Sequence, residues 1–225
     1  MANDQEKEGA ARASLQFIRD GQVVGLGTGS TAAYFIQLLA EKVKNGLRVR
    51  GIPTSERSRQ LAQNLGIPLT TLDECQEIAV TVDGADEVDP ELRLIKGGGG
   101  ALLREKIVAS ATKQFVIVAD GSKQVKTLGK FPLPVEVIRF AQPLVSKRLA
   151  ALGAEVKLRK QPDGSPYITD ENNHIVDCHF GEIRDPDQLA RQLSDMPGVV
   201  EHGLFIGMAS VALLARGSEI VELRR

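Results

Sequence analysis

Four carboxylates lie within seven residues of the chain, in the segment Asp83-Gly84-Ala85-Asp86-Glu87-Val88-Asp89. A carboxylate can accept a hydrogen bond from a hydroxyl group or move a proton. Asp83 and Asp86 are three residues apart around a Gly-Ala turn, so both could point into one cleft. The alternative is a solvated acidic loop. The D-x-D-x-D-G spacing of a calcium-binding loop is absent.

A second cluster combines a lysine with four glycines, Lys96-Gly97-Gly98-Gly99-Gly100. Four glycines are costly in conformational entropy, and they make sense where the backbone must approach a ligand closely. Lys96 is a candidate cation for an oxyanion or a phosphate. Glu105 follows in the predicted helix 101–112, and its helical neighbours are apolar: Ala101, Leu102, Val108 and Ala109. Partial burial would raise its pKa into the range of a general base. The alternative is a surface glutamate flanked by Arg104 and Lys106.

Hydroxyl groups gather in a third cluster, Gly25-Leu26-Gly27-Thr28-Gly29-Ser30-Thr31, between a predicted strand and a predicted helix. The spacing is neither G-x-G-x-x-G nor a Walker A loop, because position 30 is serine and no lysine follows. Exposed N–H groups at a helix N-terminus suit a phosphate monoester. A tight turn with Thr or Ser as the helix N-cap is an equal alternative. Lys123, in Asp120-Gly121-Ser122-Lys123, is either a further anion contact or part of a plain surface turn.

The elements that must position these loops alternate between strand and helix. This order indicates β-α-β crossovers and a largely parallel sheet, at whose carboxyl edge ligands bind. We predict helices at 5–19, 31–44, 56–65 (capped by Ser55) and 101–112, and strands at 23–25, 47–52, 78–82 and 115–119.

The pattern changes after Phe131, where Pro132 and Pro134 interrupt any helix. We therefore predict a smaller α+β domain at 132–204, while 1–131 and 205–225 form the first domain. Its expected elements are helices at 142–152 and 186–194 and strands at 154–159, 175–180 and 198–201. Two closing strands, at 209–214 and 219–223, are expected to return to the first domain.

Composition excludes several classes of function. The 225 residues carry 28 Lys and Arg against 29 Asp and Glu, and aromatic residues make up only 4%. A near-neutral chain with few aromatics favours neither nucleic acid nor a membrane surface as partner. We expect no signal peptide or membrane span, and so a cytoplasmic protein. We expect no catalytic metal, because three histidines and two cysteines lack ligand spacing: His174, His179, His202, Cys75 and Cys178.

Together the loops offer a phosphate site, paired acids, a cation and a sheltered glutamate. Proton transfer beside the carbonyl of a sugar phosphate is the simplest chemistry for this set. A base removes a carbon-bound proton, a cation and N–H groups stabilise the enediolate, and the proton returns one carbon over. A sensor that only binds sugar phosphates, an amino-sugar-phosphate isomerase/deaminase and a coenzyme A transferase are the alternatives.

The chain resembles type A ribose-5-phosphate isomerases over nearly its whole length. The motifs are LGTGSTA at 26–32, TSERSRQLA at 54–62, DGADEVD at 83–89, LIKGGGGALLREKIVA at 94–109, DGSK at 120–123 and LPVEV at 133–137. The resemblance implies interconversion of ribose 5-phosphate and ribulose 5-phosphate in the non-oxidative pentose phosphate pathway, without a cofactor. It also implies a Rossmann-like α/β domain with a smaller inserted domain, and a homodimer or higher homo-oligomer. One departure is Asp-Glu-Asn-Asn at 170–173, where relatives often carry Asn-Gly.

The resemblance also implies roles for residues of this sequence. Glu105 corresponds to the base that moves the proton between C2 and C1. Beyond the resemblance, we hypothesise that Asp83 or Asp86 assists ring opening, and that Lys96 and Lys123 meet the phosphate and the oxyanion in an order left open. The substrate-binding residues implied are Thr28, Gly29, Ser30, Thr31, Asp83, Gly84, Ala85, Asp86, Lys96, Gly97, Gly98, Gly99 and Lys123.

Overall fold

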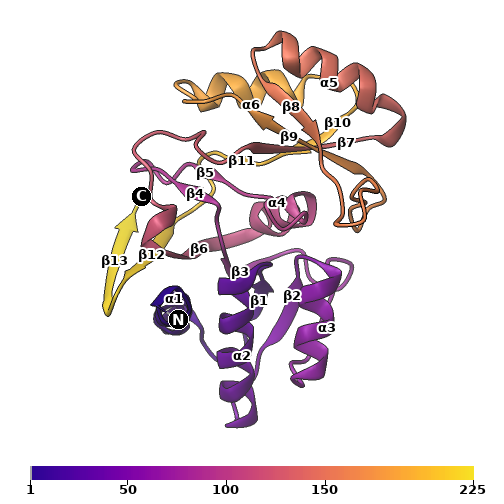
Figure 1. Ribbon diagram of the computed structural model, residues 1–225. Helices are drawn as coiled ribbons and strands as arrows, with labels where there is room; N and C mark the ends of the chain where they lie inside the picture. Colours follow the sequence, from indigo (N-terminus) through magenta and orange to yellow (C-terminus); the bar gives the residue numbers. More distant parts are fainter. Residues whose placement is uncertain (1) are drawn as a thin grey trace.

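The computed structural model describes residues 2–225, which form three β-sheets (Figure 1). The largest sheet has the strand order β13-β12-β6-β3-β1-β2, parallel except for β13. The predicted α/β class with a mostly parallel central sheet is confirmed. The strands are β1 (Val23–Leu26), β2 (Arg50–Pro53), β3 (Ile78–Asp83), β6 (Thr112–Asp120), β12 (Val211–Arg216) and β13 (Glu219–Arg224).

Three helices cover one face of this sheet: α1 (Ala2–Ser14), α2 (Ser30–Lys44) and α3 (Glu56–Asn64). Side chains alternate along a strand, so each buried strand serves two cores. In β6, Val116 and Val118 pack among the helices, while Phe115 and Ile117 pack on the opposite face.

A smaller antiparallel sheet has the order β10-β7-β9-β8, with two helices packed on it (Figure 1). A third sheet, β11-β5-β4, lies between the two larger ones. The elements are β7 (Leu133–Val137), β8 (Glu155–Leu158), β9 (His174–His179), β10 (Val199–His202), α5 (Gln142–Ala151), α6 (Pro186–Ser194), β4 (Glu87–Val88), β5 (Leu94–Ile95) and β11 (Leu204–Phe205).

Helix α4 (Leu102–Ser110) lies between the six-stranded and four-stranded sheets (Figure 1). It contacts β3 and β6 of the first sheet and β7 and β10 of the second. A helix packed from both sides can bury a polar side chain on either face, and α4 carries Glu105. Short 3₁₀ helices at Leu15–Phe17, Gly121–Lys123 and Arg139–Ala141 complete the elements.

Strand β7 was not among the predicted elements, because Pro134 removes a backbone donor and usually marks an edge or a break. Here it lies in a strand paired on both sides, and its carbonyl accepts from the N–H of Gly203 at 2.8 Å. The short strands β4, β5 and β11 were also missed, since two residues are too few for a period to show.

Most other boundaries differ from prediction by a few residues. The first helix ends at Ser14 instead of 19, and the strand expected from Leu47 begins at Arg50. The predicted N-cap is confirmed, since Ser55 accepts from the N–H of Ser58 at 3.0 Å. The unusual turn at 170–173 is formed without glycine, because Asn172 adopts the left-handed conformation at φ 62°, which asparagine tolerates better than most residues.

Candidate active site

A polar cleft of about 190 Å³ opens at the carboxyl ends of β1, β3 and β6, where the strand order reverses between β1 and β3. Open α/β sheets bind ligands at this place. The cleft brings together all of the predicted site residues except Asp83, which lies directly beneath it. The lining is Lys7, Thr28, Gly29, Ser30, Thr31, Gly84, Ala85, Asp86, Lys96, Gly97, Gly98, Gly99, Glu105, Ala119, Asp120, Ser122 and Lys123.

Three charged side chains form a buried cluster at one part of the cleft. Lys96 Nζ lies 3.0 Å from Asp83 Oδ2 and 3.3 Å from Glu105 Oε2. The Lys96 ammonium also donates to the carbonyl of Gly84 at 2.5 Å. All three side chains are at most 4% exposed. Within residues 2–225, Asp83 Oδ2 and Glu105 Oε2 are both buried without a well-aligned hydrogen-bond donor, so the ion pairs with Lys96 are what compensates their charge.

Burial controls the titration of this cluster. Desolvation raises the pKa of Glu105 to about 8, with the Lys96 charge opposing and the Asp83 and Asp86 charges adding to the rise. Desolvation also raises the pKa of Asp83. For Lys96, burial alone would lower the pKa, but the Asp83 and Glu105 carboxylates outweigh it and raise the value. The predicted elevation of the Glu105 pKa is thus confirmed, and Lys96 stays charged beside it.

The two aspartates of the acidic loop have different surroundings. Asp83 is fully buried, and its Oδ1 accepts from the N–H groups of Thr28 at 2.9 Å and Gly84 at 2.7 Å. Asp86 lies on the cleft wall, where its Oδ2 accepts from the N–H of Gly98 at 2.7 Å. Asp83 therefore holds the floor of the site together, while Asp86 faces what binds there.

The other two acids of the loop are structural. Glu87 is buried and accepts from the N–H groups of Gly129 and Phe131, at 2.7 and 2.6 Å. Asp89 is buried and pairs with the guanidinium of Arg93 at 2.6 Å. The idea of a simple solvated acidic loop is therefore wrong.

The N-terminus of α2 points its backbone at the cleft. Its N-cap is Gly29, at φ 109°, with no side-chain cap, so the alternative of a Thr or Ser cap is wrong. The hydroxyl of Thr28 is occupied by a cluster on the α3 side, with Thr54, Ser55 and Ser58 oxygens at 2.8, 2.8 and 3.1 Å. This leaves the hydroxyls of Ser30 and Thr31, with the helix N–H groups, facing a ligand.

Lys7 is a cleft residue that the sequence did not predict; Ala119, Asp120 and Ser122, which neighbour the predicted Lys123, also line the cleft. Lys7 comes from α1, far from every loop motif, and reaches the lining only because α1 packs against α2. Its side chain is 19% exposed, and its ammonium lies 3.9 Å from Asp4 Oδ1. A lone lysine on an amphipathic helix gives no signal in sequence. Lys123, which was predicted, lines the same cleft at the end of β6.

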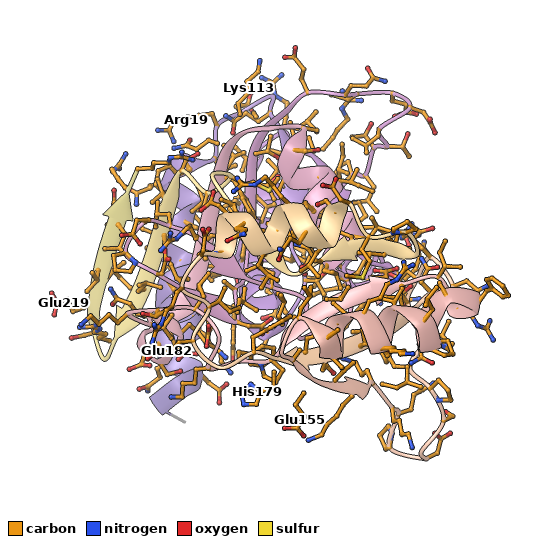
Figure 2. The ribbon with its side chains drawn as sticks, turned by 90° about the horizontal axis from the view of Figure 1, so that it is seen from above. Arg19, Lys113, Glu155, His179, Glu182 and Glu219 are labelled. Atoms are coloured by element: carbon orange, nitrogen blue, oxygen red, sulfur yellow. The ribbon has the colours of Figure 1, made fainter. Side chains whose placement is uncertain are left out.

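The histidines lie outside this cleft. Burial lowers the pKa of His202 to about 4, and its ring contacts Lys106 and Ser194. His179 lies at the periphery with Glu155 and Glu182, pointing outward (Figure 2). Across residues 2–225, no group of three His, Cys, Asp or Glu side chains is arranged to hold a metal ion. No helix in that range has the length and apolar character needed to cross a membrane.

Comparison with known proteins places the chain in a family. The family model described as ribose 5-phosphate isomerase A (phosphoriboisomerase A) matches residues 50–219. The chain belongs to this family. The ribose-5-phosphate isomerase A of Parvibaculum lavamentivorans is 53% identical over 98% of this chain and 99% of its own length. The one from Roseiflexus castenholzii is 54% identical over 95% and 93%.

Solved structures agree with the sequence relatives. A D-ribose-5-phosphate isomerase in complex with phospho-erythronic acid superimposes with a TM-score of 0.97, at 41% identity and full coverage of both chains. Ribose 5-phosphate isomerase A from Methanocaldococcus jannaschii gives 0.94, at 42% identity over 98% of this chain and 99% of that one. The protein is an aldose–ketose isomerase that interconverts ribose 5-phosphate and ribulose 5-phosphate, and the sensor and transferase alternatives are wrong.

Proposed function

We propose that Glu105 is the base that carries the proton between C2 and C1 of the open-chain sugar phosphate. The observation that carries this proposal is its position: a buried carboxyl on the cleft wall, 3.3 Å from Lys96, with a pKa raised to about 8. A base with a pKa near the working pH transfers protons in both directions, as an isomerase requires.

In this proposal Lys96 and the N–H of Gly99, in the glycine ribbon (residues 97–100), stabilise the enediolate. The N–H groups of Gly98 and Gly100 already donate to Asp86 Oδ2 and to the carbonyl of Gly97. Lys96 is the cation nearest to Glu105, so negative charge that develops on the sugar oxygens beside the base lies next to its ammonium. Preorganised donors in a buried site need no rearrangement as the charge develops. This assigns Lys96 to the oxyanion.

In this proposal the phosphate binds to the remaining polar groups of the cleft: Ser30, Thr31, the N-terminus of α2, Lys123 and Lys7. In residues 2–225 Lys123 has no carboxylate partner, so its charge is available to an anion. A helix N-terminus without a side-chain cap offers backbone donors as well.

Asp86 is the aspartate that assists ring opening. Both oxygens of Asp83 are engaged, by backbone N–H groups and by Lys96, whereas Asp86 lies on the cleft wall. The role of Asp83 is to hold Lys96 in place and keep it charged.

Turnover of ribose 5-phosphate by Glu105→Gln tests the base. Loss of a general base predicts a fall in kcat of roughly 10²–10⁴-fold with little change in KM. Near-normal turnover would overturn the assignment. The assay is repeated with a chelator, and activity that survives supports a reaction without a metal.

Phospho-erythronic acid, bound in the related structure, is a suitable probe for this cleft. It carries a carboxylate at one end and a phosphate at the other. We expect competitive inhibition, with the carboxylate beside Lys96 and the phosphate beside Lys123. Lys96→Ala should weaken this inhibitor more than it weakens inorganic phosphate, which uses only the other end.

A homodimer or higher homo-oligomer is also proposed. Three apolar side chains in the first turn of α5 and the 3₁₀ segment before it support it, because they are unusually exposed for their size: Phe140 at 96%, Leu144 at 51% and Ile138 at 49%. Large exposed apolar groups that lie together indicate a contact surface. Sedimentation of the wild type and of Phe140→Asp measures the association, and a monomeric wild type would contradict it.

The remaining proposals concern organisation and surroundings. We propose two domains, 1–131 with 205–225 and 132–204, supported by the separate six-stranded and four-stranded sheets. Limited proteolysis should cut first near these boundaries. A cytoplasmic location without nucleic-acid or membrane partners is supported by the near-neutral charge, and cell fractionation tests it.

A further inference from the structure

We propose that Arg159, which follows β8 in the smaller sheet, is a positioning residue that aims backbone N–H groups of the glycine ribbon into the cleft. Nothing in the chemistry of the isomerisation requires an arginine so far from Glu105 in the chain. Its effect would be carried by the peptide groups on either side of Gly98.

The contacts of Arg159 are unusually complete. Its Nη1 donates to the carbonyls of Gly97 at 2.8 Å and Gly98 at 3.2 Å. Its Nε donates to Asp177 Oδ2 at 2.9 Å, and its Nη2 pairs with the other oxygen of the same carboxylate. The Arg159 side chain is only 14% exposed. A bidentate arginine–carboxylate pair fixes the plane of the guanidinium, so the Nη1 group is held at one place.

Peptide geometry transmits this position to the cleft. In a planar trans peptide the C=O and the N–H point in opposite directions. A cation at the carbonyls of Gly97 and Gly98 therefore leaves the N–H groups of Gly98 and Gly99 pointing away from it. The N–H of Gly98 does reach Asp86 Oδ2 on the cleft wall, at 2.7 Å. Within residues 2–225 the N–H of Gly99 has no protein partner, and Gly99 lines the cleft.

The ribbon needs such a support because glycine is the most flexible residue. Tyr167 supplies a second contact, since its hydroxyl lies 2.2 Å from where a Cβ on Gly100 would be. Its ring in turn lies 5.9 Å from the Arg159 guanidinium. Arg159 and Tyr167 come from the same segment of the smaller sheet and are linked through backbone, with Tyr167 N–H donating to the carbonyl of Arg159 at 2.9 Å. The segment holds the ribbon at two points.

The charge of Arg159 also strengthens these donors. A carbonyl that accepts a hydrogen bond from a cation polarises its peptide, and the N–H at the other end becomes a better donor. This inference rests on the proposed role of the Gly99 N–H as a donor to the enediolate, while the Gly98 N–H orients Asp86. Arg159 acts only through these two groups and does not touch the substrate.

The test compares Arg159→Ala and Arg159→Lys with Lys157→Ala, which removes an equal charge from the same segment at a side chain that is 75% exposed. A misplacement of about 1 Å in a catalytic group costs on the order of 10²-fold. For Arg159→Ala we expect kcat to fall roughly 10- to 100-fold, with KM changed less than about threefold. Arg159→Lys replaces the branched guanidinium with a single ammonium, so its kcat should lie between those of Arg159→Ala and the wild type. The kcat of Lys157→Ala should match that of the wild type.

Ligand binding separates positioning from general damage to the cleft. Phospho-erythronic acid, whose carboxylate occupies the enediolate end, should bind Arg159→Ala more weakly in proportion to the loss of kcat. Inorganic phosphate, which needs only the other end, should bind as it does to the wild type. If Arg159→Ala does not fold, Arg159→Lys carries the same comparison.

Two results would overturn the inference. One is that kcat of both Arg159 variants lies within about twofold of kcat of Lys157→Ala. Such a difference is far smaller than the loss expected for a misplaced group. The other is an equal weakening of phospho-erythronic acid and inorganic phosphate. Glu105→Gln is measured alongside: a normal rate there refutes the proposed base, whereas an inactive Glu105→Gln beside a normal Arg159→Ala refutes this inference alone.

Discussion

The ionisation of Glu105 should limit the rate of this enzyme at neutral pH. Its carboxyl is buried, and desolvation raises the pKa to about 8 even though Lys96 lies 3.3 Å away. Only the ionised form can accept a proton from carbon. The quantity kcat/KM follows the ionisation of the free enzyme, so it should rise with pH through this pKa.

The expected size of the effect follows from the pKa. With a value of about 8, roughly one molecule in eleven carries the Glu105 carboxylate at pH 7, and roughly ten in eleven carry it at pH 9. The value of kcat/KM should therefore rise about tenfold between pH 7 and pH 9. A solvent-exposed glutamate, with its ordinary pKa of about 4.3, would give a flat profile over this range.

The assay is a series of initial rates with ribose 5-phosphate from pH 6 to 9.5. The phosphate of a phosphorylated group has a second pKa of about 6. Ionisation of the substrate phosphate therefore gives a separate rise in the profile of kcat/KM against pH, at lower pH than the rise due to Glu105. Asp83→Asn supplies a directional check. It removes a negative charge that raises the pKa of Glu105, so the rise of kcat/KM should move to lower pH. A profile that is flat from pH 7 to 9, or a rise that moves to higher pH in Asp83→Asn, would refute the reasoning.

Four further outcomes are expected. Lys96→Ala should lower kcat about 10²–10³-fold, the usual cost of one oxyanion donor, and an unchanged kcat would return Lys96 to a structural role. Lys7→Ala should raise KM more than it lowers kcat, because α1 contributes charge to the cleft and not to the base; steady-state kinetics decide this. Gly98→Ala should lose most activity, since a Cβ there would lie 2.6 Å from Asp86 Oδ1. In urea unfolding, the stability of Glu105→Gln relative to the wild type should grow from pH 5 to pH 8, because the native carboxyl holds its proton to about pH 8 while the unfolded one releases it near 4.5; a constant difference would contradict the raised pKa.

Local patterns account for the elements that the sequence predicted well. Each apolar strand and each amphipathic helix is recognisable from a short local segment of the sequence. The alternation of these segments predicted the parallel sheet and the order of its loops. Loops that follow parallel strands must meet at one edge, so Thr28, Asp83 and Lys123 could be brought together without coordinates. The apolar neighbours of Glu105 likewise predicted its burial, because they lie within one helical turn or so of it.

Contacts between distant segments were decided only by the tertiary structure. The sequence by itself determined which loops reach the cleft, but not that Asp83 lies beneath it while Asp86 faces it, since that depends on where Lys96 enters from β5. Lys7 reaches the site from α1, and Arg159 reaches it from the smaller sheet. The hydrophobic periodicity of the sequence does not predict the packing that brings them there. Side-chain periodicity is a short-range property, whereas burial, ion pairing and the shifted pKa of Glu105 arise from the sum of long-range contacts, and only the folded chain supplies these.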